Sequence, residues 1–131
     1  MKKIILLIAL LIFGFSGVYA DKVEQTTTSD SLEVTSSWTT VKTLVTARYE
    51  NMSVLIYNGT TDSIMAYKID GYVYSGSSRT SPIMDSTRIT GVDTDYIEYS
   101  PNTFNKVVIK VRGISDSIYY QVDTTIKNSS K

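Results

Sequence analysis

The 131-residue chain contains neither cysteine nor histidine, and these two absences exclude much of the chemistry available to a small protein. Without cysteine there are no disulfides, thiol nucleophiles or cysteine metal sites, so the domain must be stabilised by its hydrophobic core. Without histidine the chain lacks the commonest general base and the commonest metal ligand. Phosphate loops, zinc motifs and nucleophile elbows are also missing. We therefore expect no enzyme activity and no cofactor, with Ca²⁺ as the one alternative considered below.

An excess of positive charge is also missing. The chain has 13 basic and 13 acidic side chains. Removal of the first 20 residues, which include Lys2 and Lys3, leaves 11 basic and 13 acidic side chains, a net charge of −2. A general nucleic-acid or anionic-membrane binder is strongly basic. We therefore expect no nucleic-acid partner.

The first 20 residues have the composition of a secretory signal peptide. The basic pair Lys2-Lys3 precedes an apolar segment over residues 4–15, and small or tolerated residues lead up to Ala20. The alternative is an uncleaved membrane anchor, but a spanning helix needs roughly 20 apolar residues and this segment is shorter. We expect cleavage after Ala20, no stable membrane span afterwards, and a secreted, periplasmic or cell-surface location.

Apolar residues at helical spacing are missing as well, and alternation with a period of two is present instead. Residues 106–112 and 118–126 alternate between apolar and polar side chains, as in strands with one buried face. Seven or eight such segments are separated by turn signals about ten residues apart. This pattern predicts an all-β fold, a two-sheet antiparallel β-sandwich of jelly-roll or immunoglobulin-like topology.

The strongest strand signals surround an Asn58-Gly59 turn. Residues 54–57 are apolar in succession, which is typical of a strand covered on both sides, and residues 65–73 alternate. The pair predicts a β-hairpin at the centre of the domain. The core is then expected to contain Val54, Ile56, Met65, Tyr67, Ile69, Val107, Ile109, Val111, Ile118, Tyr120 and Val122.

The remaining segments complete the domain organisation. Residues 21–31 are polar and threonine-rich, and we expect a flexible arm. This arm is either a disordered linker or a strand that is donated to the sheet edge of a neighbouring molecule. The β-sandwich domain is expected over residues 32–127, followed by a frayed tail over residues 128–131.

Aromatic residues are the best candidates for a binding surface. Tyr72 and Tyr74 share one side of a strand with Lys68 and Asp70, and this side is expected to face solvent. Exposed aromatic side chains stack on sugar rings or anchor a protein interface. Tyrosine also suits a half-buried pleated surface without any ligand. The candidate binding residues are Trp38, Tyr72, Tyr74 and Tyr119.

Charged residues give two weaker signals. Asp93 and Asp95 form an Asp-x-Asp pair that can supply two Ca²⁺ ligands, although aspartate in a glycine-containing turn usually bonds to its own backbone. A basic stripe on one strand either meets an anionic partner or is a solvated face balanced by Asp123 on the next strand, and we expect the latter. This stripe consists of Lys106, Lys110 and Arg112.

Three sequons place Asn51, Asn58 and Asn128 at expected turns or near the end of the domain, so the protein is a possible glycoprotein. In a chain so rich in serine and threonine, sequons also arise by chance.

Together these observations predict an exported, non-catalytic β-sandwich that acts as a structural or interaction subunit through protein partners or self-assembly. The alternative is a carbohydrate or small-ligand binding module that uses Trp38 and exposed tyrosines. A virion structural component is a further alternative.

Overall fold

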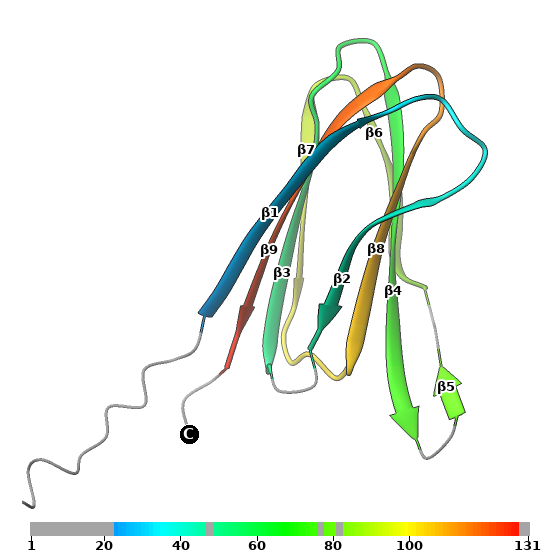
Figure 1. The fold of residues 1–131 in the computed structure, drawn as a ribbon. Coiled ribbons are helices and arrows are strands. Elements are labelled where there is room, and N and C mark those ends of the chain that lie inside the picture. The colour runs from blue at the N-terminus through cyan, green and yellow to red at the C-terminus, as the bar shows by residue number, and fades with distance from the viewer. Residues whose placement is uncertain (1–22, 47–48, 76–77, 81–82, 129–131) are drawn as a thin grey trace, which may run out of the picture.

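The computed structural model describes residues 23–46, 49–75, 78–80 and 83–128, and their regular structure consists of β-strands (Figure 1). The expected signal peptide lies outside these ranges. Within them, no helix of sufficient length and apolarity to span a membrane is found. The strands are β1 (Val23–Leu32), β2 (Thr39–Val45), β3 (Asn51–Asn58), β4 (Ile64–Ser75), β5 (Ser78–Thr80), β6 (Ile83–Thr90), β7 (Asp93–Tyr99), β8 (Lys106–Gly113) and β9 (Ile118–Lys127).

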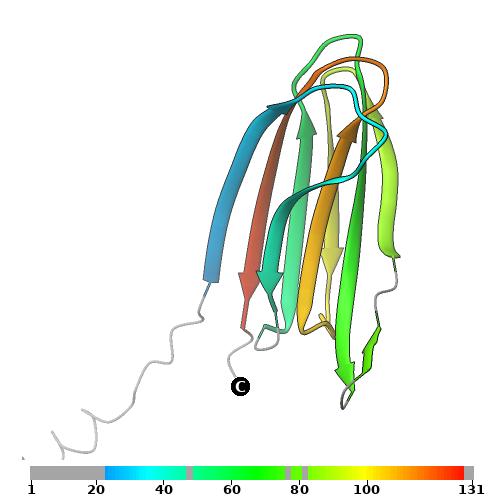
Figure 2. The same cartoon turned by 45° about the vertical axis from the view of Figure 1, so that its right-hand side comes forward.

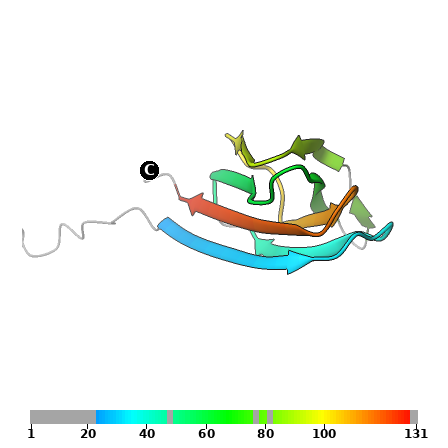
Figure 3. The same cartoon turned by 90° about the horizontal axis from the view of Figure 1, so that it is seen from above.

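The strands form two antiparallel sheets that pack face to face, which confirms the predicted β-sandwich. One sheet has the order β1-β9-β3-β7. The other has the order β2-β8-β4, with β5 and β6 paired along the far side of β4. Figures 2 and 3 show β1 and β9 side by side at one margin of the molecule.

The pairing is nested, and this settles the topology that the sequence left open. Strand β4 pairs with β6, β3 with β7, β2 with β8, and β1 with β9, all antiparallel. The chain is therefore one long folded ribbon rolled into two sheets, which is the jelly-roll arrangement. In an immunoglobulin-like sandwich the first two strands share a sheet, whereas here β1 and β2 lie in different sheets.

The predicted central hairpin is wrong, because β3 and β4 belong to different sheets. The turn at Asn58 and Gly59 crosses from one sheet to the other. The Asn58 side chain is fully buried, donates to Ser63 Oγ over 3.0 Å and accepts from the Thr60 backbone N–H. Gly59 N–H donates to the carbonyl oxygen of Tyr119 on β9. An Asn-Gly signal thus serves here as an arch between sheets.

Strand β3 also differs from the expected strand covered on both sides. Its burial alternates along its whole length. Val54 and Ile56 are fully buried, while Leu55 and Tyr57 are only half-buried on the outer face. An antiparallel sheet in a sandwich keeps one face towards water, so successive apolar residues here divide between the two faces.

The expected flexible arm is instead an ordered edge strand over residues 23–31. Strand β1 pairs with β9 in unbroken register from Val23 opposite Lys127 to Leu32 opposite Ile118. Leu32 packs against the core, and the hydroxyls of Thr26 and Thr124 are 2.7 Å apart. The segment finds its partner in its own chain because β9 offers backbone hydrogen bonds along its whole length.

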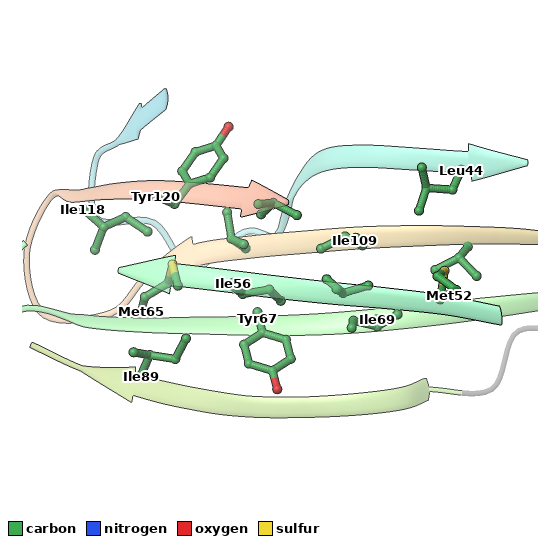
Figure 4. Close-up of a cluster of buried hydrophobic side chains, with 14 of the residues drawn as sticks. Leu44, Met52, Ile56, Met65, Tyr67, Ile69, Ile89, Ile109, Ile118 and Tyr120 are labelled. Carbon is green, nitrogen blue, oxygen red and sulfur yellow. The ribbon is translucent and has the colours of Figure 1, made fainter. Parts of the chain in front are cut away.

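The predicted core is confirmed, since all eleven of its residues are buried. They come from β3, β4, β8 and β9, and their side chains fill the space between the sheets (Figure 4). Strand β9 alternates as the sequence indicated, with Tyr120 buried and Tyr119 exposed. Ile126 is also buried, as the alternation of residues 118–126 predicts. The sequence did not indicate three further buried members of the cluster, which are Leu44, Met52 and Ile89.

Replacement of Gly113 by alanine is expected to destabilise the fold by about 1–3 kcal/mol. A β-carbon at Gly113 would lie 2.8 Å from the carbonyl oxygen of Asp116 and 3.5 Å from that of Glu33. The control is Gly91→Asn, because a β-carbon added at Gly91 would meet no atom within 4 Å. Gly91 has a φ of +67°, and asparagine tolerates this backbone conformation. Urea unfolding should show a smaller loss for Gly91→Asn; equal losses would contradict the argument.

Candidate functional site

The outer face of the β2-β8-β4-β6 sheet concentrates positive charge. Side chains that are paired across neighbouring strands point to the same face, and the register brings together cations from three strands. The only carboxylate at the described outer positions of these strands is Asp70. We call this surface the basic face and define it by Lys68, Arg88, Lys106, Lys110 and Arg112.

Asp70 is buried within the basic face, not solvent-exposed as expected. Its carboxylate accepts from Lys110 Nζ at 2.8 Å, and its side chain is 7% exposed. This hydrogen bond raises the pKa of the Lys110 ammonium. The sequence had assigned the balancing charge to Asp123, which is wrong, because Asp123 lies on β9 in the other sheet. Asp70 is covered because β4 is flanked by β8 and β6.

The aromatic side chains of this face contact cations of their own chain. Trp38, in the connection from β1 to β2, has Lys68 Nζ at 4.9 Å and Arg112 Cζ at 4.6 Å from its ring centroid. Lys106 Nζ lies 4.4 Å from the centroid of the Tyr72 ring. These cation–π contacts hold the long side chains against the sheet. They also reduce the aromatic surface available for stacking on a ligand.

A hollow of about 260 Å³ opens on this face, between the β4–β6 pair and Trp38. Ala66 is paired with Arg112 on β8 and with Arg88 on β6, so a small side chain separates two guanidinium groups. Arg112 Nη1 donates to the Ser36 carbonyl oxygen at 3.2 Å, while its buried Nε has no hydrogen-bond partner. The residues that line the hollow are Trp38, Ala66, Tyr67, Ser86, Thr87, Arg88 and Arg112.

The sequence identified Trp38 and the stripe on β8 but missed Arg88 and Ala66. The segment that holds Arg88 has few large apolar residues, so its strand signal is weak. This segment is strand β6, and its pairing with β4 places Arg88 on the basic face. No signal within the segment itself could have revealed that partner.

The four candidate binding aromatics do not form one site. Trp38 and Tyr72 belong to the basic face, whereas Tyr119 is 42% exposed on the outer face of the other sheet. A β-carbon at Gly59 would lie within 3 Å of both the Tyr119 and Tyr57 rings, so Tyr119 packs beside that turn. The side chain of Tyr74 lies outside the described part of the structure.

Asp93 and Asp95, the candidate Ca²⁺ ligands, have other partners. Asp93 Oδ1 accepts from the Thr94 backbone N–H at 2.7 Å. Asp95 Oδ2 accepts from the Tyr67 hydroxyl at 2.6 Å, across the two sheets. Burial, followed by this hydrogen bond, raises the pKa of that hydroxyl. Within the described ranges, no three acidic side chains gather as a metal site would require.

The three sequons differ in accessibility. Asn58 is fully buried, and its Nδ2 donates to Ser63, so a glycan there would require this arch to open. Asn51 is half-buried, and its Oδ1 accepts from Ser100 Oγ at 2.6 Å. Asn128 is half-buried just beyond β9.

No protein-family model matches the chain, and no curated protein matches it. Among solved structures, the SPBc2 prophage-derived protein YomS is 15% identical, with 85% of this chain and 97% of that chain covered and a TM-score of 0.54. A protein of the Bacillus endospore appendages, described as disulfide-linked pili, is 8% identical, with coverages of 86% and 92% and a TM-score of 0.48. A chain of infectious bursal disease virus is 10% identical, with coverages of 83% and 32% and a TM-score of 0.45. The similarity to YomS shows a shared fold and does not extend to function.

Proposed function

We propose that this protein is an exported, non-catalytic subunit that associates with a second copy of itself through the free edge of β1. The observation that carries this proposal is the character of that edge. A long, regular edge strand presents unpaired backbone N–H and C=O groups to any strand that comes alongside. The non-catalytic part is supported by the lack of histidine and cysteine.

The other sheet edges carry more of the features that discourage pairing than β1 does. Strand β2 has a register shift between Thr40 and Lys42. Strand β6 carries Arg88 and pairs with β4 through another shift. Strand β7 carries three carboxylates in seven residues. Strand β1 runs for ten residues without a register shift and contains no proline or lysine, two of the usual protections of an edge. Its charged side chains are the two carboxylates Glu24 and Asp30.

Charge distinguishes the two registers that overlap two β1 strands most fully, which have the two-fold axis at Thr27 or at Thr28. Two antiparallel copies related by a two-fold axis place residues of the same face opposite each other. An axis at Thr27 would put Glu24 opposite Asp30 of the second copy, and these like charges repel. An axis at Thr28 puts Glu24 opposite Leu32 and avoids that contact. The expected dimer therefore has a continuous eight-stranded sheet centred on Thr28.

The proposal predicts that the mature protein is a dimer and that lysines on β1 make it a monomer. Thr27→Lys with Ser29→Lys changes two exposed outer-face positions, which oppose each other across the proposed interface. The matched control, Thr40→Lys with Thr43→Lys, adds the same charge at exposed positions on the edge of β2. Light scattering after size exclusion gives the mass, and circular dichroism confirms folding.

We expect the wild type and the β2 control to be dimers and the β1 variant to be a folded monomer. A monomeric wild type at high concentration, or a β1 variant that still dimerises, would rule out the β1 interface. The exported location is tested separately by mass spectrometry of protein recovered outside the cytoplasm. Its chain should begin at Asp21, and one that begins at Met1 would contradict signal cleavage.

A further inference from the structure

We propose that the basic face binds an acidic polysaccharide, with one anionic group of the ligand held over Ala66 between Arg88 and Arg112. This site lies on a different sheet from β1, so the inference does not depend on the proposed dimer. The first observation is charge: five cations share the face with one carboxylate, and that carboxylate is already paired with Lys110. Arg88 is exposed and the other four cations are half-buried, so this face is locally basic even though the chain as a whole is not.

The second observation is the geometry at Ala66. Neighbouring strands are about 4.8 Å apart, so the backbones of Arg88 and Arg112 lie about 10 Å apart on either side of Ala66. Guanidinium groups on side chains of this length can approach one anion from both sides, and each can bind a carboxylate or sulfate through two hydrogen bonds. Because Ala66 has only a methyl group, the space between them stays open as the hollow.

The third observation is that an exposed hydrogen-bond donor remains available. Arg88 is exposed and makes no hydrogen bond or ion pair with any residue in the described part of the chain. Ser86, which lines the same hollow and is paired with Lys68 on this face, adds a hydroxyl group suited to the hydroxyls of a sugar. The hollow therefore combines anion donors with neutral polar groups.

The extent of the basic face favours an extended ligand over a single small anion. Arg112, Lys110 and Lys106 follow β8 over a length of about 20 Å, at about 3.4 Å per residue. A linear chain with an acidic group on successive sugars can engage several of these cations at once. Single-stranded nucleic acid fits less well, because it relies on stacking of bases on aromatic rings. Here the Trp38 and Tyr72 rings already contact cations.

Trp38 is the only tryptophan in the chain, so its fluorescence reports directly on the edge of the hollow. Titration of the protein with polygalacturonate and with dextran sulfate should change this fluorescence, and the apparent affinity should fall as salt rises. The two titrations show whether carboxylate or sulfate is preferred. Neutral dextran and single-stranded DNA of equal charge are the comparison ligands.

We expect Arg88→Gln to weaken binding of the better polyanion by about tenfold or more, since a charged hydrogen-bond donor is lost. The matched control is Lys127→Gln, which removes one cation from an exposed position on the other sheet and should leave affinity within about twofold. Ala66→Leu should also weaken binding by filling the hollow. The proposal is overturned if neither polyanion binds at low salt, if DNA binds as tightly, or if Arg88→Gln behaves like the wild type.

Discussion

Replacement of Ile109 by alanine is expected to lower the free energy of unfolding by about 2–5 kcal/mol. Ile109 is fully buried on β8, the strand between β2 and β4, and is paired with Ile69 of β4. Because its neighbours come from several strands, they cannot all move to close the space left by the lost carbon atoms. Urea-induced unfolding followed by circular dichroism measures the loss.

The matched control for this prediction is Val45→Ala. Val45 is 72% exposed on the edge strand β2, so its truncation should change stability by no more than about 0.5 kcal/mol. A loss below about 0.5 kcal/mol for Ile109→Ala would place β8 on the wrong face and would contradict the assigned core.

Replacement of Lys110 by methionine is expected to destabilise the domain by about 1–3 kcal/mol at neutral pH. Methionine keeps most of the packing of the lysine stem but leaves the Asp70 carboxylate, which is 7% exposed, without its partner. Urea unfolding at pH 7 measures the loss.

The wild type should lose the stabilisation that this ion pair provides as the pH rises into the basic range. The folded-state pKa of Lys110 is raised by Asp70, so this pair contributes fully below the ordinary lysine pKa of about 10.4. The contribution is lost as the pH rises through the higher folded-state value. Chemical denaturation between pH 9 and 11.5 measures this decline, which Lys110→Met should lack.

The double variant Asp70→Asn with Lys110→Met is the control for both measurements. It removes both charges, so it should be less destabilised at pH 7 than Lys110→Met alone, and it should lack the decline of the wild type between pH 9 and 11.5. If the double variant is the less stable of the two at pH 7, the buried charge is not the cause.

The sequence predicted which side chains are buried better than which strands are neighbours. Alternation in β9 identified Ile118, Tyr120 and Val122 as buried, because a period of two is a local property of the strand. The partners of β3 are not local, because β3 pairs with β7 and β9, which lie far along the chain. An Asn-Gly turn has the same signature in a hairpin and in an arch, so the signal at Asn58 could not distinguish them.

The candidate site was predictable to a similar degree. Trp38 and the cations of β8 stand out by residue type and spacing. The burial of Asp70 and the contribution of Arg88 depend on which strands flank β4, and strand order cannot be read from one sequence. Strand β1 was missed for another reason: its inward positions include Thr26 and Thr28, so its alternation lacks the apolar contrast on which the analysis depends.

The nested order of the strands also sets the order in which the domain can be completed during synthesis. Strand β1 leaves the ribosome before every other described strand, yet its intramolecular partner β9 is the last of them. Thr26 and Thr124, which meet in the finished sheet, are separated by 98 positions in the chain. Pairings over such distances are slow, because a large loop must close before any contact is gained. Because β1 is rich in threonine and only weakly apolar, it can remain unpaired in water until β9 has been synthesised.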